Sequence, residues 1–128
     1  MNQPMEATGG LISDLAEAEK PFLVFFKSEY CDYCKALEPA IAVISSRYGE
    51  TIGVYLLDVD VNEDAANAFK DYTDGVPSVV LFFGGNFAVL KDPEAPDPYM
   101  WYRLSYLEDF IKAFLEDIYE ANEQKPNL

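Results

Sequence analysis

The stretch from residue 22 to residue 48 reads FLVFFKSEYCDYCKALEPAIAVISSRY and joins an apolar run, two cysteines and a helical pattern in direct succession. Residues 22–26 are all apolar and rich in strand formers, which predicts a strand that is buried on both faces. From residue 32 to about residue 48, apolar side chains recur at helical spacing, which predicts a long helix. Cys31 and Cys34 are the only cysteines among the 128 residues, and they lie where this strand leads into this helix. Their position indicates a dithiol/disulfide pair.

The spacing of Cys31 and Cys34 also occurs in zinc sites, in haem attachment and in structural disulfides. A zinc site needs four ligands, usually mostly cysteine and histidine, and the sequence has no histidine and no third cysteine, so we expect no metal site. Haem attachment requires a histidine directly after the second cysteine, where this chain has Lys35. A disulfide that closes so short a loop adds little stability. Redox chemistry is the interpretation that these residues favour, and a pair of inert thiols is the alternative.

The composition fits one domain with its own core. Half of the 128 residues are apolar and 15% are aromatic, which is enough to form a core without structural disulfides. We expect a single domain over residues 1–128, with a core from about 10 to 118 and a flexible tail from about 121 to 128. The formal net charge of −14 argues against nucleic acid and anionic lipid as partners, because proteins bind both by neutralising phosphates with Lys and Arg.

The cellular location is predicted from three features of the sequence. The first 20 residues lack the charged-then-apolar layout of a secretory signal. The longest apolar runs, 22–26 and 79–83, are too short to span a bilayer. The chain also has no spare cysteine pairs of the kind that small secreted domains carry. We therefore expect a cytoplasmic protein without a membrane partner, and we expect it to act as a monomer.

Turn residues and apolar periodicity divide the chain into short alternating segments. The predicted order is helix 11–20, strand 22–26, helix 32–48, strand 51–59, helix 62–72, strand 79–83, turn 84–86, strand 87–90, an acidic excursion at 91–98, an edge strand at 99–102 and helix 105–118. Helices between strands imply parallel crossovers, and the last two main strands form a hairpin. We therefore expect an α/β fold with a mixed central sheet of about four strands and helices on both faces.

With this order, the chain resembles the thioredoxin-fold family over roughly residues 10 to 118. The resemblance rests on several landmarks that occur in the order and spacing of the family. These landmarks are the strand 22–26, the motif Cys31–Lys35, Pro39 inside the helix, the strand exit 57–62 (LDVDVN), the loop 75–77 (GVP) and the glycine pair at 84–85. The resemblance implies a thioredoxin fold and an enzyme that exchanges thiols and disulfides.

The resemblance also implies where a substrate binds. It implies that Val76–Pro77 is a cis peptide bond facing the cysteines, and that this loop binds extended substrate segments through the backbone of Val76. Tyr30 and Tyr33 flank the cysteines and would offer an aromatic platform for a substrate polypeptide. The alternative for the two tyrosines is that they pack beside the motif without binding substrate.

The sequence departs from the thioredoxin pattern at the motif and beneath it. Family thioredoxins carry Trp-Cys-Gly-Pro-Cys, whereas residues 30–34 read Tyr-Cys-Asp-Tyr-Cys, and a tyrosine before the second cysteine resembles glutaredoxins. Thioredoxins also have a buried aspartate and a lysine at the positions that hold Phe25 and Leu56 here. Because this proton relay is missing, we expect water or a loop carboxylate such as Glu29 or Asp32 to take the proton of the second cysteine.

The order of reaction follows from the helix. A thiolate is the nucleophile, and the N-terminus of a helix favours negative charge. Cys31 lies at that end, so we expect it to attack, whereas Cys34 lies one turn further, should be buried, and should resolve the mixed disulfide. The charged side chains expected to modulate the attacking thiolate are Lys27, Lys35, Glu29, Asp32 and Glu38. The lysines would favour the thiolate and the carboxylates would oppose it.

These features predict a thiol–disulfide oxidoreductase that acts on protein disulfides through Cys31 and Cys34 and contributes to cell redox homeostasis. We expect no cofactor other than the redox-active disulfide. The expected partners are protein thiols or disulfides and a reductase or oxidant. One alternative is a binding or adaptor module that kept the fold with weak or lost redox activity. The other is a glutaredoxin-like, glutathione-dependent enzyme, although an acidic chain is poorly suited to the anionic glutathione.

Overall fold

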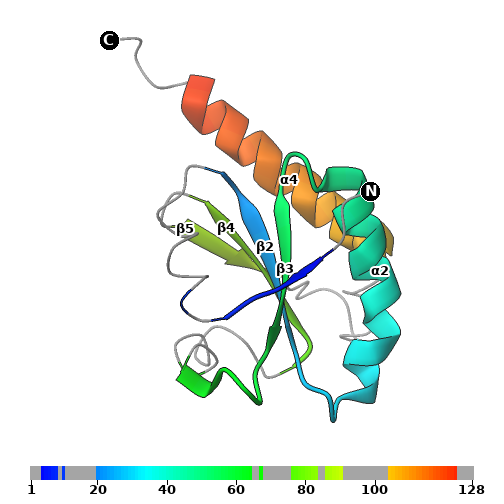
Figure 1. Cartoon of the computed structure of the whole chain (residues 1–128). Coiled ribbons are helices and arrows are strands. Elements are labelled where there is room, and N and C mark those ends of the chain that lie inside the picture. Colours follow the sequence, from blue (N-terminus) through cyan, green and yellow to red (C-terminus); the bar gives the residue numbers. More distant parts are fainter. Residues whose placement is uncertain are drawn as a thin grey trace.

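A central β-sheet organises the chain in the computed structural model, which describes residues 4–8, 10, 20–64, 67, 76–83, 86–90 and 104–123 (Figure 1). The described strands are β1 (Met5–Glu6), β2 (Phe22–Lys27), β3 (Gly53–Asp58), β4 (Ser78–Phe83) and β5 (Asn86–Val89). The described helices are α2 (Asp32–Tyr48) and α4 (Leu104–Glu123). The strands form one sheet in the order β1-β3-β2-β4-β5.

The middle strand of the sheet is the apolar run predicted from the sequence. β2 pairs in parallel with β3 and antiparallel with β4, so hydrogen-bonded strands flank it on both edges. All five residues of the run 22–26 are buried, at no more than 3% exposure. A strand with both edges paired and both faces covered has no polar side, which explains why apolar residues do not alternate with polar ones here. The mixed α/β sheet predicted from the sequence is confirmed.

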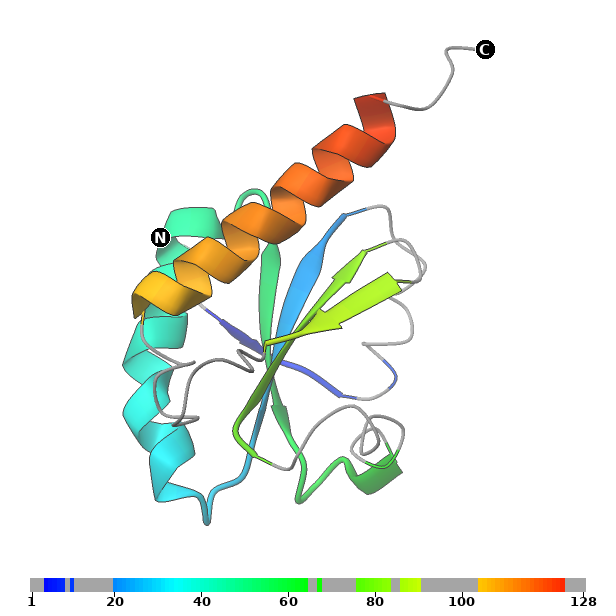
Figure 2. The same ribbon diagram turned by 180° about the vertical axis from the view of Figure 1, so that it is seen from behind.

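Helices α2 and α4 cover one face of this sheet. Figure 2 shows α4 crossing in front of the strands, with α2 beside it. Side chains from both helices and from the facing strands form one cluster, which we call the helix-side core: Leu23, Phe25, Cys34, Ile41, Ile44, Ile52, Val54, Val79, Leu81, Leu90, Leu107 and Ile111. The members from each helix lie three, four or seven residues apart, as helical periodicity requires. Because Cys34 belongs to this core, the core holds one sulfur of the predicted redox pair in place.

The other face of the sheet carries a second apolar cluster. Its buried members are Ala7, Phe22, Val24, Phe26, Leu57, Val80 and Phe82. The rings of Phe22 and Phe82 are stacked, with centroids 4.8 Å apart. Residues 11–19 of the predicted helix 11–20 and most of the predicted helix 62–72 lie outside the described residues, although 63, 64 and 67 are helical. Helix cover on this face therefore stays a prediction.

The fifth strand, β1, was not predicted from the sequence. Met5 and Glu6 lie opposite Tyr55 and Leu56 of β3 in a parallel pairing, and the Ala7 N–H donates to the Leu56 carbonyl at 2.8 Å. Both β1 side chains are exposed, so the strand is held by backbone hydrogen bonds and leaves no apolar alternation in the sequence. The sheet consequently has five strands where about four were expected.

Several element ends differ from the predicted ones by a few residues. Asn86 was predicted in the hairpin turn but belongs to β5, because it pairs with Phe83. α4 begins at Leu104 and continues to Glu123, so residues 121–123 of the predicted tail are helical. The glycine pair of the turn, the excursion 91–98 and the edge strand 99–102 lie outside the described residues.

Candidate active site

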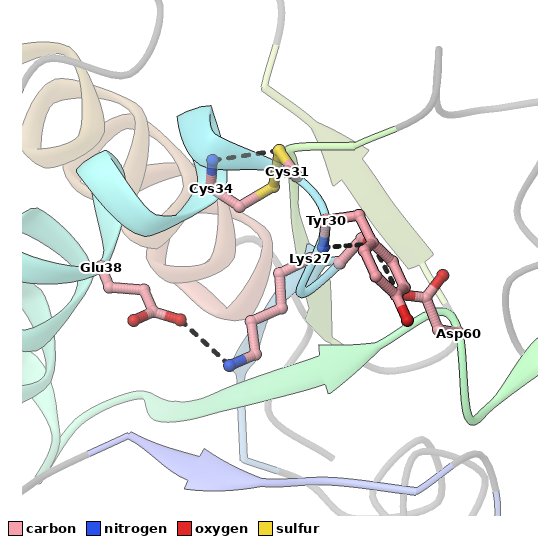
Figure 3. Close-up of a disulfide and its surroundings, with 7 residues drawn as sticks. Lys27, Tyr30, Cys31, Cys34, Glu38 and Asp60 are labelled. Atoms are coloured by element: carbon pink, nitrogen blue, oxygen red, sulfur yellow. Dashed lines mark hydrogen bonds and ion pairs between the residues drawn. A yellow bond between two sulfur atoms is a disulfide. The ribbon is translucent and has the colours of Figure 1, made fainter.

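The two cysteines form a disulfide at the junction of β2 and α2 (Figure 3). Their Cα atoms are 5.3 Å apart. Cys31 is the N-cap residue of α2, with extended backbone angles of φ −100° and ψ 99°. Its carbonyl accepts a hydrogen bond from the Lys35 N–H at 3.3 Å, which starts the helix. The predicted position of the pair at the strand–helix junction is confirmed.

The sulfur of Cys31 acts as the capping acceptor of the helix. Its Sγ accepts a hydrogen bond from the backbone N–H of Cys34 at 3.0 Å. The first N–H groups of a helix have no partner inside the helix, and they favour a negatively charged acceptor. Cys31 is partly exposed, whereas Cys34 is only 1% exposed within the helix-side core. The accessible sulfur is thus the one that the helix N-terminus would stabilise as a thiolate.

A buried serine fixes the loop that leads into Cys31. The hydroxyl of Ser28 donates to Asp60 Oδ2 at 2.5 Å and accepts the backbone N–H of Tyr30 at 3.2 Å. The Ser28 carbonyl accepts the Cys31 N–H at 3.2 Å. These contacts tie the loop to the residues that follow β3. This role of Ser28 was not predicted from the sequence, because Asp60 is 32 residues away and no local pattern links the two side chains.

Lys27 lies beneath the start of α2 and contacts two carboxylates. Its Nζ is 3.0 Å from Glu38 Oε1 and 3.5 Å from Glu6 Oε1, and its side chain is 17% exposed. Burial lowers the pKa of Lys27, but the hydrogen bond and charge of Glu38 and the charge of Glu6 outweigh burial, so the pKa is raised above its ordinary value. From the sequence, Lys27 and Glu38 were expected to act as separate charges with opposite effects on the thiolate. The structure joins them in one ion pair.

The other predicted site residues differ in how far their side chains are exposed. Tyr30 is 89% exposed. Tyr33 and Val76 are half-buried and pack against the helix-side core, which Cys31 also contacts. The peptide bond between Val76 and Pro77 is cis, as the resemblance implied.

The remaining predicted modulators lie at the surface around the first turn of α2. Glu29, Asp32 and Lys35 are all exposed. Substrate binding by the tyrosines and by the Val76–Pro77 loop, and modulation by these three charges, stay predictions.

Known proteins resemble this chain over most of its length. A family model described as Thioredoxin matches residues 9–97, which is more than half of the chain. This chain belongs to the thioredoxin family. Thioredoxin-like protein slr1139 of Synechocystis sp. is 33% identical over 92 residues, which cover 72% of this chain and 83% of that protein.

Two further comparisons show how much of the chain resembles known thioredoxins. A bifunctional thioredoxin reductase/thioredoxin of Mycobacterium leprae is 34% identical over 73 residues, covering 57% of this chain but 16% of that larger protein. A mutant thioredoxin from Halobacterium salinarum superimposes with a TM-score of 0.67 at 24% identity, covering 87% of this chain and 89% of that one. At this identity, the structural likeness shows the thioredoxin fold alone. Family membership and the paired cysteines make the chain a thiol–disulfide oxidoreductase.

The two positions that hold the proton relay in other thioredoxins, Phe25 and Leu56, are apolar in this chain. Phe25 is 0% exposed and lies in the helix-side core with Cys34, and Leu56 packs against the same core. Phe25 and Leu56 are direct neighbours in the parallel pairing of β2 with β3. Neither position offers a proton acceptor.

In the ranges that the structure describes, no group of three or more His, Cys, Asp and Glu side chains could hold a metal ion. In the same ranges, neither α2 nor α4 is long and apolar enough to cross a membrane.

Proposed function

We propose that this thioredoxin-family chain exchanges disulfides with other proteins, with Cys31 as the nucleophile and Cys34 as the resolving cysteine. The observation that carries this assignment is the capping geometry. The Cys31 sulfur is partly exposed and accepts the Cys34 N–H at 3.0 Å, whereas the Cys34 sulfur is buried. An incoming disulfide can therefore meet Cys31 but not Cys34.

The reaction of the reduced chain has two exchange steps. The Cys31 thiolate attacks one sulfur of a substrate disulfide, a mixed disulfide forms, and the other substrate sulfur leaves as a thiolate. The Cys34 thiolate then attacks Cys31 Sγ, so that the Cys31–Cys34 disulfide forms and the second substrate sulfur is released. Two electrons pass from the chain to the substrate. The reverse sequence would oxidise a substrate dithiol.

The surface around Cys31 supports a protein substrate. Exposed Tyr30 and half-buried Tyr33 flank the cysteines along the chain, and Val76 and Pro77 lie partly exposed directly before β4. We assign these four residues to substrate binding. The exposed charges of Glu29, Asp32 and Lys35 would modulate which substrates approach and how readily the Cys31 thiolate forms.

The partners follow from the two-electron cycle. After each turnover the chain needs a reductase, or an oxidant if it runs in the other direction, and one relative carries a thioredoxin reductase and a thioredoxin in one protein. The redox-active disulfide would serve without a further cofactor. We also propose that the chain works as a monomer in the cytoplasm and contributes to redox homeostasis there. Size-exclusion chromatography and cell fractionation test these two points.

The test of the function uses two single variants and a protein disulfide substrate such as insulin. Cys31→Ser should abolish reduction of insulin, because the nucleophile is gone. Cys34→Ser should accumulate a mixed disulfide with the substrate, visible as a reducible band of higher mass. Full activity of the Cys31→Ser protein would refute the assignment, and a chain that reacts only with glutathione mixed disulfides would point to the glutaredoxin-like alternative.

A further inference from the structure

The apolar surroundings of Cys34 make the resolving step difficult. Cys34 must lose its proton before it can attack, and a thiol among apolar side chains ionises reluctantly because its thiolate is poorly solvated. Cys34 is 1% exposed, and Phe25 and Leu56 lie in or against the core around it. A proton acceptor close to Cys34 would remove this obstacle.

Of the two carboxylates of α2, Asp32 and Glu38, only Glu38 has a spacing from Cys34 that places both side chains on one helix face. It follows Cys34 by four residues, and side chains four apart on a helix have Cβ atoms about 5–6 Å apart on one face. Figure 3 shows Cys34 and Glu38 projecting from the same side of α2. The Glu38 side chain is 41% exposed, so a proton that it accepts can exchange with solvent.

Lys27 holds the Glu38 carboxylate on this face. Lys27 follows Phe25 by two residues on β2, so both side chains project from the helix side of the sheet. Its ammonium contacts Glu38 at 3.0 Å and Glu6 of β1 at 3.5 Å, and these carboxylates outweigh the effect of burial, so the pKa of Lys27 is raised above its ordinary value. The ion pair therefore fixes the position of the Glu38 carboxylate on the helix face that also carries Cys34.

The other charged side chains near Lys27 and Glu38 either lie exposed at the surface or contact other groups. Asp58 of β3 lies beside Lys27 in the sheet, but its Oδ1 accepts the Asp60 N–H at 2.9 Å. Glu29, Asp32 and Lys35 are exposed around the first turn of α2. The carboxylates that were expected from the sequence to take the proton are therefore exposed, whereas the Glu38 carboxylate is held by Lys27.

We propose that Glu38, positioned by Lys27, is the proton acceptor of the resolving step. The Cys34 thiol transfers its proton to the Glu38 carboxylate, directly or through one water, and the thiolate attacks Cys31 Sγ. The bond between Cys31 and the substrate sulfur breaks, and the departing thiolate takes the proton back from Glu38. The proposal rests on the two-step exchange proposed above and replaces Glu29 and Asp32 with Glu38.

The sign of one mutational effect separates this role from simple electrostatics. A carboxylate that only sits near Cys34 disfavours the Cys34 thiolate by charge repulsion. Its neutralisation in Glu38→Gln would then leave the resolving step unchanged or make it faster. If Glu38 accepts the proton, the same substitution makes the resolving step slower.

The experiment mixes the reduced chain with a chromogenic aromatic disulfide that releases one coloured thiolate in each exchange step. The first phase reports the attack of Cys31, and the second phase reports resolution by Cys34. At pH 7 the second phase of Glu38→Gln should be about 100-fold slower, the usual scale of general-base catalysis, while the first phase persists. The difference should shrink as the pH rises above the ordinary thiol pKa of about 8.5, because hydroxide then competes with Glu38 for the Cys34 proton. Lys27→Met should slow the second phase less, and Lys27→Arg should restore it.

Glu108→Gln is the matched control, because Glu108 also pairs with a cation across two elements but lies against Arg47 near the far end of α2. Its second phase should equal that of the unaltered chain. A Glu38→Gln second phase as fast as or faster than the unaltered one at pH 7 would overturn the proposal. If the unaltered chain shows no first phase at all, the proposed function fails instead, so the two failures are distinguishable.

Discussion

The two ends of α2 differ in what their side chains contact. At the first turn, the Cys31 sulfur caps the helix, Cys34 enters the core, and Glu38 follows one turn later with Lys27. At the last turns, Ile44 is fully buried, and the Gly49 N–H simply continues the helical pattern to the Ser45 carbonyl. The far end is anchored by apolar packing, whereas the near end carries the two cysteines and the Lys27–Glu38 ion pair. Substitutions at the two ends should therefore separate stability from reactivity.

The largest loss of stability is expected at the far end. Ile44 is 0% exposed in the helix-side core, and Ile44→Ala should destabilise the fold by about 2–5 kcal/mol, the range for deleting a buried aliphatic side chain. The measurement is urea unfolding. Its control is Val43→Ala, a half-buried neighbour that should cost about 1 kcal/mol or less. Below the unfolding transition, the rate of Cys31 attack should be unchanged, and a large drop in that rate would contradict the separation of the two ends.

A smaller loss of stability, now coupled to reactivity, is expected at the near end. Ser28→Ala removes the hydrogen bond to Asp60 and the acceptor of the Tyr30 N–H, and should destabilise the fold by about 1.5–3 kcal/mol, the scale for hydrogen bonds to charged groups. It should also slow the attack of Cys31, because the loop before the cap is released. Stopped-flow thiol release measures this rate. Ser46→Ala, at an exposed position of α2, should change neither quantity.

The parts of the fold that sequence analysis predicted are those with a strong periodic signal. In the run 22–26 and the helix 32–48, the apolar pattern of the sequence predicts which side chains are buried, because nearly every buried side chain there is apolar. β1 left no such signal, since Met5 and Glu6 are exposed and their pairing with β3 is made by the backbone. The cis bond at Val76–Pro77 came from the family resemblance and not from local propensity.

The reactive cysteines were predicted from the sequence, but the contacts between the charged residues near them were not. Cys31 and Cys34 were identified because their spacing and helix position carry meaning by themselves. The pairing of Lys27 with Glu38 joins residues that are 11 apart in the chain, and the sheet and helix geometry bring them together. A weak signal for Glu38 did exist in its four-residue offset from Cys34, but only the fold shows the lysine that holds it.

The Lys27 network should give a pH dependence of stability at alkaline pH. Burial lowers the lysine pKa, but Glu38 and Glu6 raise it further, so the folded-state pKa lies above the ordinary 10.5. Below pH 10.5 the stabilisation is fully present, because the lysine is protonated in the folded and unfolded chains alike. As pH rises through the folded-state pKa, the ammonium is lost and the stabilisation with it. The stability difference between the unaltered chain and Lys27→Met should therefore be constant near neutrality and shrink above pH 10.5, which urea unfolding at a series of pH values measures.

The smallest effect is expected for the ion pair near the far end of α2. The Arg47 side chain is 56% exposed, although that of Glu108 is only 18% exposed, so water and salt screen the pair. A double-mutant cycle of Arg47→Gln and Glu108→Gln should give a coupling of about 0.2–1 kcal/mol that decreases at high salt. The corresponding cycle of Lys27→Met and Glu38→Gln should give a larger coupling, because Lys27 is 17% exposed and shielded beneath α2. If the Arg47–Glu108 coupling proved the larger of the two, the charges at the near end would be no better held than ordinary surface charges, and a positioned role for Glu38 would lose its structural basis.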